Sequence, residues 1–248
     1  MEAFVANQQG QSPSYDSTDA YAATFLTLLR AYAEANPGDG AYLAGKAADI
    51  ELIATAAVAT QQPDGLTWAR PDYQAKYLMD NVEVEQGLRD YAWLLRNVLN
   101  DPVGADNWAA RADAVRQGIK AWLWAPCGGS MYCWASDQLR PTWSVWYPDS
   151  VAQLWPVNSG VASSSRAASL YGNFNQAWPN WTTTGDNPDG HPWAVLCYAA
   201  ALRADKARAD ACLNGSGTNW AARGRPWPWT TADAADRARA AKLAMSLR

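Results

Sequence analysis

Hydrophobic residues recur with the period of an α-helix along most of this 248-residue chain. In one segment Val84, Leu88, Tyr91, Leu95 and Val98 fall on a single stripe, as expected for a helix that packs by one face. The same period predicts helices over the ranges 17–35, 42–60, 81–99, 106–124, 150–156, 160–178, 192–203, 205–213 and 231–247. Alternation of Val, Ile and Thr with polar residues is missing from the sequence, so we expect an all-α fold.

The connections between these helices fall into two length classes. Short turns of the αα-hairpin type lie at 36–41 and 100–105, where Pro and Gly cluster. Much longer connections separate the predicted hairpins, at 61–80, 125–149, 179–191 and 214–230. Long connections in a compact domain usually carry function. Because consecutive antiparallel helices point in opposite directions, the connections that lead into every second helix lie at the same end of the domain. The sequence therefore predicts one domain, residues 1–248, with the long loops on one face.

Tryptophan is concentrated in those long loops. The chain has 15 tryptophans, and the long loops contain Trp68, Trp134, Trp143, Trp146, Trp181, Trp220, Trp227 and Trp229. An indole face suits stacking on a sugar ring, although we expect about half of this set to hold the loops in place. Tryptophans on or beside the helical stripes are interpreted as core, namely Trp93, Trp108, Trp122 and Trp155.

Three segments resemble the junctions between loops and inner helices of the six-hairpin glycosidases, which fold as an (α/α)6 toroid. They are 15–21 (YDSTDAY), 64–68 (DGLTW) and 77–83 (YLMDNVE). The resemblance is one of architecture, spans nearly the whole chain and fixes no single family. It implies a bowl lined by acidic and aromatic side chains, in a carbohydrate-active protein. About nine helices are expected here against twelve in a full toroid, so we expect an incomplete barrel that lacks an N-terminal hairpin.

Acidic residues at these junctions are the candidates for chemistry. Hydrolysis of a glycosidic bond needs two carboxyls, roughly 5–5.5 Å apart for retention or about 6.5–9.5 Å apart for inversion. The catalytic candidates are Asp16, Asp19, Asp80 and Asp149, with Asp16 or Asp19 paired with Asp80 or Asp149 as the leading combination. Further acids at such junctions are Glu83, Asp186 and Asp189.

Helix capping is the competing explanation for the same acids. Asp16 with Asp19, and Asp80 with Glu83, have the three-residue spacing of a capping box, and Ser150 with Gln153 fits that motif fully. A carboxylate at a helix start is stabilised by the helix dipole whether or not it does chemistry. The dipole also lowers the pKa of such a carboxyl, which suits a base better than an acid.

Substrate contacts are expected from the loop face. The predicted binding residues are Trp68, Tyr77, Glu83, Trp143, Trp146, Trp181, His191 and Trp193. Tyr147 is an alternative to Tyr77 in a sugar subsite, and Arg70 or Arg140 would assist an acidic sugar. His191, the only histidine, is either a turn element before Pro192 or the acid/base of an epimerase or lyase.

Composition and charge narrow the classes of partner. A net charge of -4 and a pI near 5.0 give no basic surface for nucleic acid. No apolar run approaches the roughly 20 residues of a membrane span, and Met1 to Pro13 lacks the features of a secretory signal. A secreted or periplasmic location is expected only if the full-length protein carries a signal sequence.

Cysteine and histidine usage bears on redox state and metals. The four cysteines form either two disulfides, Cys127 with Cys133 and Cys197 with Cys212, or a set of reduced apolar side chains. One histidine and no closely spaced cysteine pair argue against a metal site, and no sequence motif indicates a cofactor.

The sequence thus predicts a domain that hydrolyses a glycosidic bond in an oligo- or polysaccharide, using paired carboxyls and no cofactor. The alternatives left open are a non-catalytic glycan-binding module or degenerate toroid, a sugar epimerase or polysaccharide lyase, and a helical scaffold that binds protein partners. Saturable sugar binding without turnover distinguishes the binding module from the enzymes. The absence of any sugar binding would indicate the scaffold.

Overall fold

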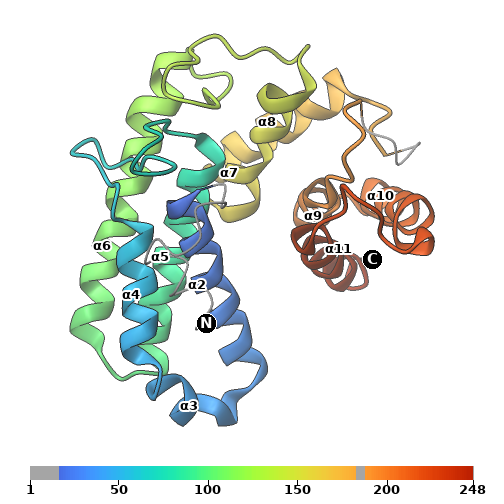
Figure 1. Ribbon diagram of the computed structural model, residues 1–248. Coiled ribbons are helices and arrows are strands. Elements are labelled where there is room, and N and C mark those ends of the chain that lie inside the picture. Colours follow the sequence, from blue (N-terminus) through green and yellow to red (C-terminus); the bar gives the residue numbers. More distant parts are fainter. Residues whose placement is uncertain (1–16, 183–187, 248) are drawn as a thin grey trace. The chain divides into compact units, whose positions relative to one another are not determined.

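The computed structural model describes residues 17–182 and 188–247, and over those residues the chain is helical (Figure 1). Only isolated bridges, such as Gln61 with Thr67, occur in the described part of the chain in place of strands. The all-α prediction is therefore confirmed. The chain divides between Leu139 and Arg140 into two compact units, called unit 1 and unit 2 below and described separately. A single domain remains a prediction.

Unit 1 consists of two long helical hairpins and their loops. Its helices are α2 (Thr18–Ala35), α3 (Gly40–Ala44), α4 (Ala47–Ala57), α5 (Leu78–Asn97) and α6 (Pro102–Gly118), which continues as a π-helical turn over Ile119–Trp124. Helix α5 packs against both α2 and α6, while α2 also packs against α4. The range expected to form one helix at 42–60 is instead broken between α3 and α4, at Gly45 and Lys46.

Helices α2 and α5 run side by side in the same direction. Near their starts Asp19 and Asn81 meet through Thr67, and further along Arg30 pairs with Asp90 at 2.8 Å. Between these points Gly87 allows a close approach, because a Cβ atom there would overlap the backbone carbonyl of Ala23. This arrangement brings the first turns of two helices that are distant in sequence to the same end of unit 1.

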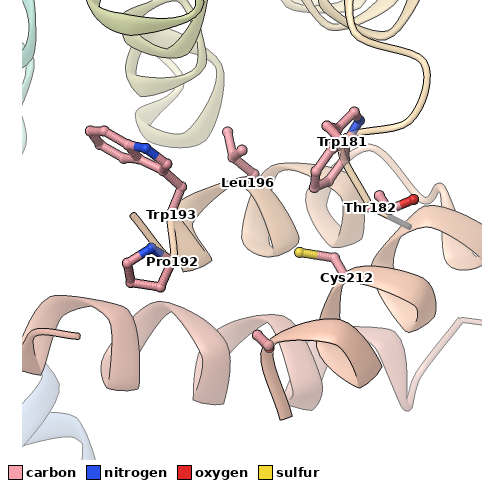
Figure 2. A pocket seen from close by; sticks show the side chains of 7 residues that line it. Trp181, Thr182, Pro192, Trp193, Leu196 and Cys212 are labelled. Carbon is pink, nitrogen blue, oxygen red and sulfur yellow. The ribbon is translucent and has the colours of Figure 1, made fainter. Parts of the chain in front are cut away.

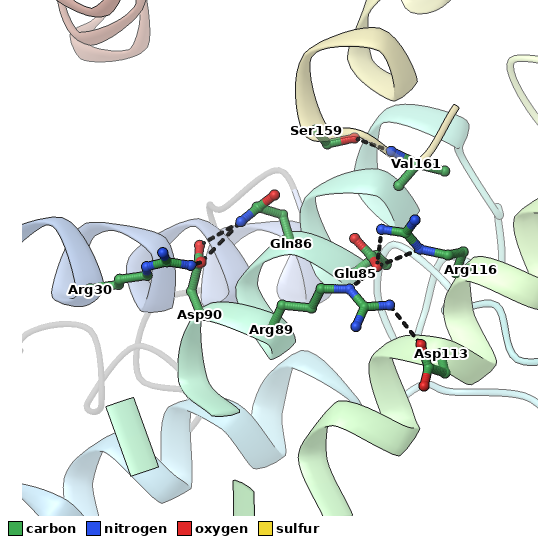
Figure 3. Close-up of polar contacts among 9 residues, drawn as sticks. All are labelled: Arg30, Glu85, Gln86, Arg89, Asp90, Asp113, Arg116, Ser159 and Val161. Carbon is green, nitrogen blue, oxygen red and sulfur yellow. Dashed lines mark hydrogen bonds and ion pairs between the residues drawn. The ribbon is translucent and has the colours of Figure 1, made fainter. Parts of the chain in front are cut away.

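Buried charge ties α5 to its neighbours (Figure 3). The Glu85 side chain is fully buried, and its Oε1 accepts hydrogen bonds from Arg89 and from Arg116, whose Nε lies 2.9 Å away. Arg116 belongs to α6, so this acid joins the two helices. A carboxylate can be buried in this way because its charge is paired with two guanidinium groups.

Unit 2 is built from shorter helices. They are a π-helical turn over Trp146–Ser150, α7 (Leu154–Ser159), α8 (Ser164–Ala177), α9 (Ala194–Leu202), α10 (Lys206–Asn219) and α11 (Thr231–Ala244). Helix α9 lies at the centre and packs against α7, α10 and α11. Helix α10 extends to Asn219, so the loop expected to start at 214 begins six residues later.

Both possible disulfides are present. Cys127 and Cys133 close the loop after α6, with Cα atoms 5.7 Å apart, and Cys197 of α9 joins Cys212 of α10 across 5.3 Å. The alternative of four reduced cysteines is therefore not what the structure shows. Within the described residues, no helix has the length and apolar character required to span a membrane.

Candidate functional site

Asp19 is the second residue of α2 and lies at the end of unit 1 where the long loop 61–77 runs. Its carboxyl is completely buried, with 0% of the residue exposed. One oxygen, Oδ1, accepts a hydrogen bond from the backbone N–H of Ala20 at 2.8 Å. The other, Oδ2, lies 2.5 Å from the hydroxyl of Thr67. The carboxyl thus joins the start of α2 to the loop.

Thr67 and Asn81 extend this contact to α5. The Asn81 side chain accepts from the Thr67 N–H at 2.8 Å, lies 3.2 Å from the Thr67 hydroxyl and donates to the Tyr77 carbonyl at 2.9 Å. Thr67 and Asn81 are both fully buried. Asp19, Thr67 and Asn81 therefore form one buried network, called the Asp19 network below.

Burial raises the pKa of Asp19 from 3.8 to about 8, because the charged form loses its water. The negative charge of Asp80 raises the pKa further, and the bonds from Thr67 and Ala20 oppose the shift only in part. Position at a helix start predicted a lowered pKa, so that expectation is wrong for Asp19. Desolvation outweighs the helix dipole here and favours the neutral acid.

Asp80 is the third residue of α5 and is half-buried, one helical position before Asn81. Among the described residues, Tyr77 before α5 and Ser17 before α2 both lack a side-chain capping bond to their helix. The first turns of these two helices are therefore held by the Asp19 network rather than by side-chain caps at Ser17 and Tyr77. Glu83, also half-buried, lies one turn further along α5.

Tyr77 lies three residues before Asp80, feels the charge of Asp80 and belongs to a group of aromatic side chains. The ring of Tyr77 is stacked on that of Trp134, with centroids 6.1 Å apart and planes 13° apart. Its hydroxyl lies 2.8 Å from the hydroxyl of Tyr73. Burial, the Tyr73 hydrogen bond and the Asp80 charge all raise the pKa of Tyr77, so the phenol stays protonated.

The other predicted residue of this loop is Trp68, which is half-buried. Its backbone bonds to Thr60, whose hydroxyl donates to the Trp68 carbonyl at 2.6 Å. Asp16, a catalytic candidate, lies outside the described residues, and so does Asp186. Unit 1 therefore brings together Asp19, Asp80 and Tyr77 from the predicted set.

Asp149 belongs to unit 2 and is 7% exposed. Its Oδ2 accepts from the N–H of Thr142 at 2.7 Å, which fixes the loop before α7. The capping box expected at Ser150 and Gln153 does not form as predicted, because the Ser150 hydroxyl donates to the Val145 carbonyl at 2.7 Å. These contacts give Asp149 and Ser150 a structural role in their loop.

Two predicted stacking residues are packed inside unit 2. Trp146 is 5% exposed and packs against Phe174 and Trp178, and Trp181 is 6% exposed and also contacts Phe174. The indole N–H of Trp181 donates to Asn175 at 2.8 Å. Trp143 is half-buried. Trp146 and Trp181 thus belong to the part of the loop set that holds loops in place.

His191 and Trp193 lie together just before α9. Trp193 has a left-handed backbone, with φ of 43°, and its indole N–H donates to the Asp189 carboxylate at 2.9 Å. Its ring centroid is 5.7 Å from that of His191 and 4.9 Å from that of Tyr147. On one side Trp193 and Pro192 border a void of about 10 Å³, room for a single water (Figure 2).

Trp193 also borders a larger cavity of about 150 Å³. The cavity is lined by Trp155, His191, Pro192, Trp193, Val195, Pro228, Thr230, Ala232, Asp233 and Asp236. We call it the Trp155–Trp193 cavity. Because Trp155 lies beside a helical stripe, the sequence predicts that it is a core residue. In the structure it borders this cavity, and its ring stands nearly perpendicular to that of Trp193, with centroids 6.2 Å apart.

Asp233 and Asp236 are site residues that the sequence reasoning missed. Asp233 completes a capping box with Thr230 at the start of α11, and its Oδ1 accepts from the N–H of Ala194 at 3.1 Å. Burial raises the pKa of Asp236 to about 6, with Arg239 acting against the shift and Asp233 adding to it. The signal in the sequence is their three-residue spacing, which places both acids on one face of α11.

Comparison with known proteins identifies no relative: neither a family model, nor a curated protein, nor a solved structure matches this chain. Residue roles are therefore inferred from the geometry of the two units. Within residues 17–182 and 188–247, no group of three or more His, Cys, Asp or Glu side chains is arranged to hold a metal ion.

Proposed function

We propose that this chain is a carbohydrate-active domain whose unit 1 hydrolyses a glycosidic bond in an oligo- or polysaccharide. The observation that carries the proposal is the contrast between two neighbouring carboxyls. Asp19 retains its proton to about pH 8, and Asp80 lies at the start of the adjacent helix as a half-buried group whose charge acts on Asp19. Two carboxyls with different environments supply the acid and the base that this reaction needs.

The proposal assigns one role to each carboxyl. Asp19 donates its proton to the glycosidic oxygen as the C–O bond breaks, and the leaving sugar departs as an alcohol. Asp80 acts as the carboxylate, either activating water or attacking the sugar carbon directly. Because Asp19 is buried, the glycosidic oxygen must replace the Thr67 hydroxyl as the partner of Oδ2, now 2.5 Å away. Thr67 is then the residue that the substrate displaces.

The aromatic residues near Asp80 support a sugar as the substrate. Tyr73, Tyr77 and Trp134 form a contiguous set of rings and hydroxyls in unit 1. Rings of this kind bind the apolar faces of sugars, while the hydroxyls of Tyr73 and Tyr77 can exchange hydrogen bonds with sugar hydroxyls. Trp68 belongs to the same loop and is proposed as a further contact.

The helix arrangement supports an α/α toroid. Helices α2 and α5 lie together and share a direction, as inner helices of successive hairpins do, while α4 packs against α2 and α6 packs against α5. The acids at the starts of α2 and α5 then belong to the floor of a bowl. We propose an incomplete (α/α)6 barrel of the six-hairpin type on this basis.

Hydrolysis of a glycan panel tests the proposal. The variants are Asp19→Asn and Asp80→Asn, with Asp16→Asn and Asp149→Asn as the other predicted carboxyls and exposed Asp106→Asn as the control. Removal of a catalytic acid or base is expected to lower kcat by about 10²–10⁴. Asp106→Asn should retain full activity. Wild-type turnover by both Asp19→Asn and Asp80→Asn would sink the assignment.

A non-catalytic glycan-binding module is the second candidate, favoured by the complete burial of Asp19. In that case the Asp19 network only connects α2, α5 and the loop. The wild-type protein would then show saturable quenching of tryptophan fluorescence by a glycan but release no reducing ends. Asp80→Asn would alter that affinity rather than a rate.

A further inference from the structure

The Trp155–Trp193 cavity of unit 2 is lined by aromatic rings and by carboxyl groups. The planes of the two indoles meet at 82°, with their centroids 6.2 Å apart. His191 adds a third ring beside Trp193. Helix α11 supplies Asp233 and Asp236 to the same cavity.

The charges around the cavity are mostly negative. Among the described residues, its lining contains two carboxylates and no lysine or arginine. Outside the lining, the guanidinium of Arg239 lies 3.3 Å from Asp236 and also donates to the Tyr198 hydroxyl at 2.8 Å. Asp189 adds a third carboxylate, held 2.9 Å from the indole nitrogen of Trp193 and 3.9 Å from His191.

The two lining acids differ in how well the protein satisfies them. Asp233 has donors on both oxygens, from Ala194 at 3.1 Å and from the Thr230 N–H at 2.9 Å. Asp236 is paired with Arg239, and its side chain is 19% exposed. Among the described residues Arg239 is the donor to Asp236 and bonds to its Oδ1, so a positive group in the cavity would gain most at the other oxygen of Asp236.

We propose that the Trp155–Trp193 cavity binds a small organic ammonium ion, with the apolar substituents against the indoles and the charge toward Asp236. Aromatic faces attract such cations through their quadrupole, and a nearby carboxylate supplies the opposite charge. The volume of about 150 Å³ is below the roughly 300–1,000 Å³ of drug-sized pockets, so the ligand is small. This site is independent of the hydrolysis proposed for unit 1.

A comparison of choline with its uncharged carbon isostere, 3,3-dimethylbutan-1-ol, distinguishes the contribution of charge to binding from that of shape. Both are titrated at pH 7.5 into the full chain by calorimetry, with sodium chloride matching ionic strength. We expect saturable choline binding and an affinity for the isostere that is weaker by about tenfold or more. Equal affinities would overturn the proposal, as would choline binding that does not saturate.

Variants then locate the binding. Asp236→Asn keeps the shape of the cavity and removes its charge, and should weaken choline binding by about tenfold. Its matched control is Asp210→Asn, an acid of α10 paired with Lys206. Trp155→Leu tests whether the Trp155 ring contributes to binding. Its control is Trp122→Phe, a change at an exposed tryptophan of unit 1. Unchanged choline affinity in folded Asp236→Asn would also overturn the proposal. If a variant fails to fold, the comparison of choline with its isostere on the wild-type chain still tests the proposal.

Discussion

Each unit contains an aspartate whose pKa is raised by burial, complete for Asp19 and partial for Asp236, and the two differ in what surrounds them. Asp19 in unit 1 is closed off, with the Thr67 hydroxyl and the Ala20 N–H as its partners. Asp236 in unit 2 opens onto a cavity and has a guanidinium 3.3 Å away. The pKa reaches about 8 in the first case and about 6 in the second.

The difference teaches which force dominates at each carboxyl. Neutral donors offset little of the desolvation of Asp19, and the charge of Asp80 adds to it. At Asp236 the positive charge of Arg239 offsets part of the same cost. Near neutral pH one unit therefore holds a proton in its interior, while the other exposes a carboxylate to a cavity. A buried carboxyl that keeps its proton suits a general acid, and a carboxylate that faces a cavity suits a binding site for a cation.

The largest expected effect concerns Asp19→Asn and pH. Between pH 3.8 and about 8 the folded chain holds a proton at Asp19 that the unfolded chain has released. The contribution of Asp19 to the unfolding free energy therefore falls as pH rises through this window, by up to about 1.4 kcal/mol per pH unit, and is constant outside it. Asparagine has no proton to lose and can still accept from Ala20, so the variant should lose this dependence.

Urea unfolding of wild type and Asp19→Asn at pH 4.5, 6 and 7.5 measures the effect. The variant should gain stability relative to wild type as pH rises. Asp106→Asn, which removes an exposed acid paired with Arg96, serves as the control and should keep the wild-type slope. Parallel curves for wild type and Asp19→Asn would show that Asp19 is ionised when folded and would remove the acid from the proposed pair.

A smaller effect compares helix packing in the two units. Gly87→Ala places a methyl group against the Ala23 carbonyl, which forces α2 and α5 apart and should destabilise the protein by about 1–3 kcal/mol. Gly172 lies in α8, where an added methyl group would meet no described atom within 4 Å, so Gly172→Ala should stabilise by up to about 1 kcal/mol. Thermal melts of both variants check the opposite signs.

Because the Asp19 network depends on the contact of α2 with α5, Gly87→Ala should also reduce activity in unit 1. Gly172→Ala should leave that activity unchanged. A neutral Gly87→Ala would mean that the two helices have room to move, and the geometry of Asp19 and Asp80 would then be less fixed than described.

Periodicity is sufficient to predict the helices, since each range identified from apolar stripes contains helix in the structure. It fails where a local break interrupts a stripe, as at Gly45 and Lys46. The predicted start of α5 is three residues late, because Leu78 begins the helix without a capping side chain at Tyr77. Periodicity reports a buried face and carries little information about helix ends.

Candidate site residues are harder to predict, because their roles depend on burial. Position at helix starts selects Asp19 and Asp80, but the raised pKa of Asp19 comes from enclosure by a loop distant in sequence. The sequence predicts that Trp155 is a core residue and that Trp181 contacts substrate, whereas Trp155 borders a cavity and Trp181 is 6% exposed. Periodicity distinguishes a tryptophan on a loop from one on a helix, but it does not show which of them is enclosed by neighbouring side chains.

The smallest effect expected is that of Asp236→Asn on stability. Here the window runs from pH 3.8 to about 6, where the folded chain retains a proton that the unfolded chain has lost. The stability difference between wild type and Asp236→Asn should therefore change inside this window and stay constant above it, while the fall due to Asp19 continues to about pH 8 in both. The change is about half as wide in pH as that for Asp19. The ion pair lost with it contributes little, because the Arg239 side chain is 53% exposed and its charge is screened by solvent.

Saturating choline sharpens this last measurement. A cation beside Asp236 favours the ionised carboxyl, so the ligand should move the upper end of the window to lower pH in wild type. The Asp236→Asn variant should show no such shift, and the Asp19 window should stay in place because that carboxyl belongs to unit 1. A choline-induced shift of equal size in wild type and in Asp236→Asn would place the bound cation away from Asp236.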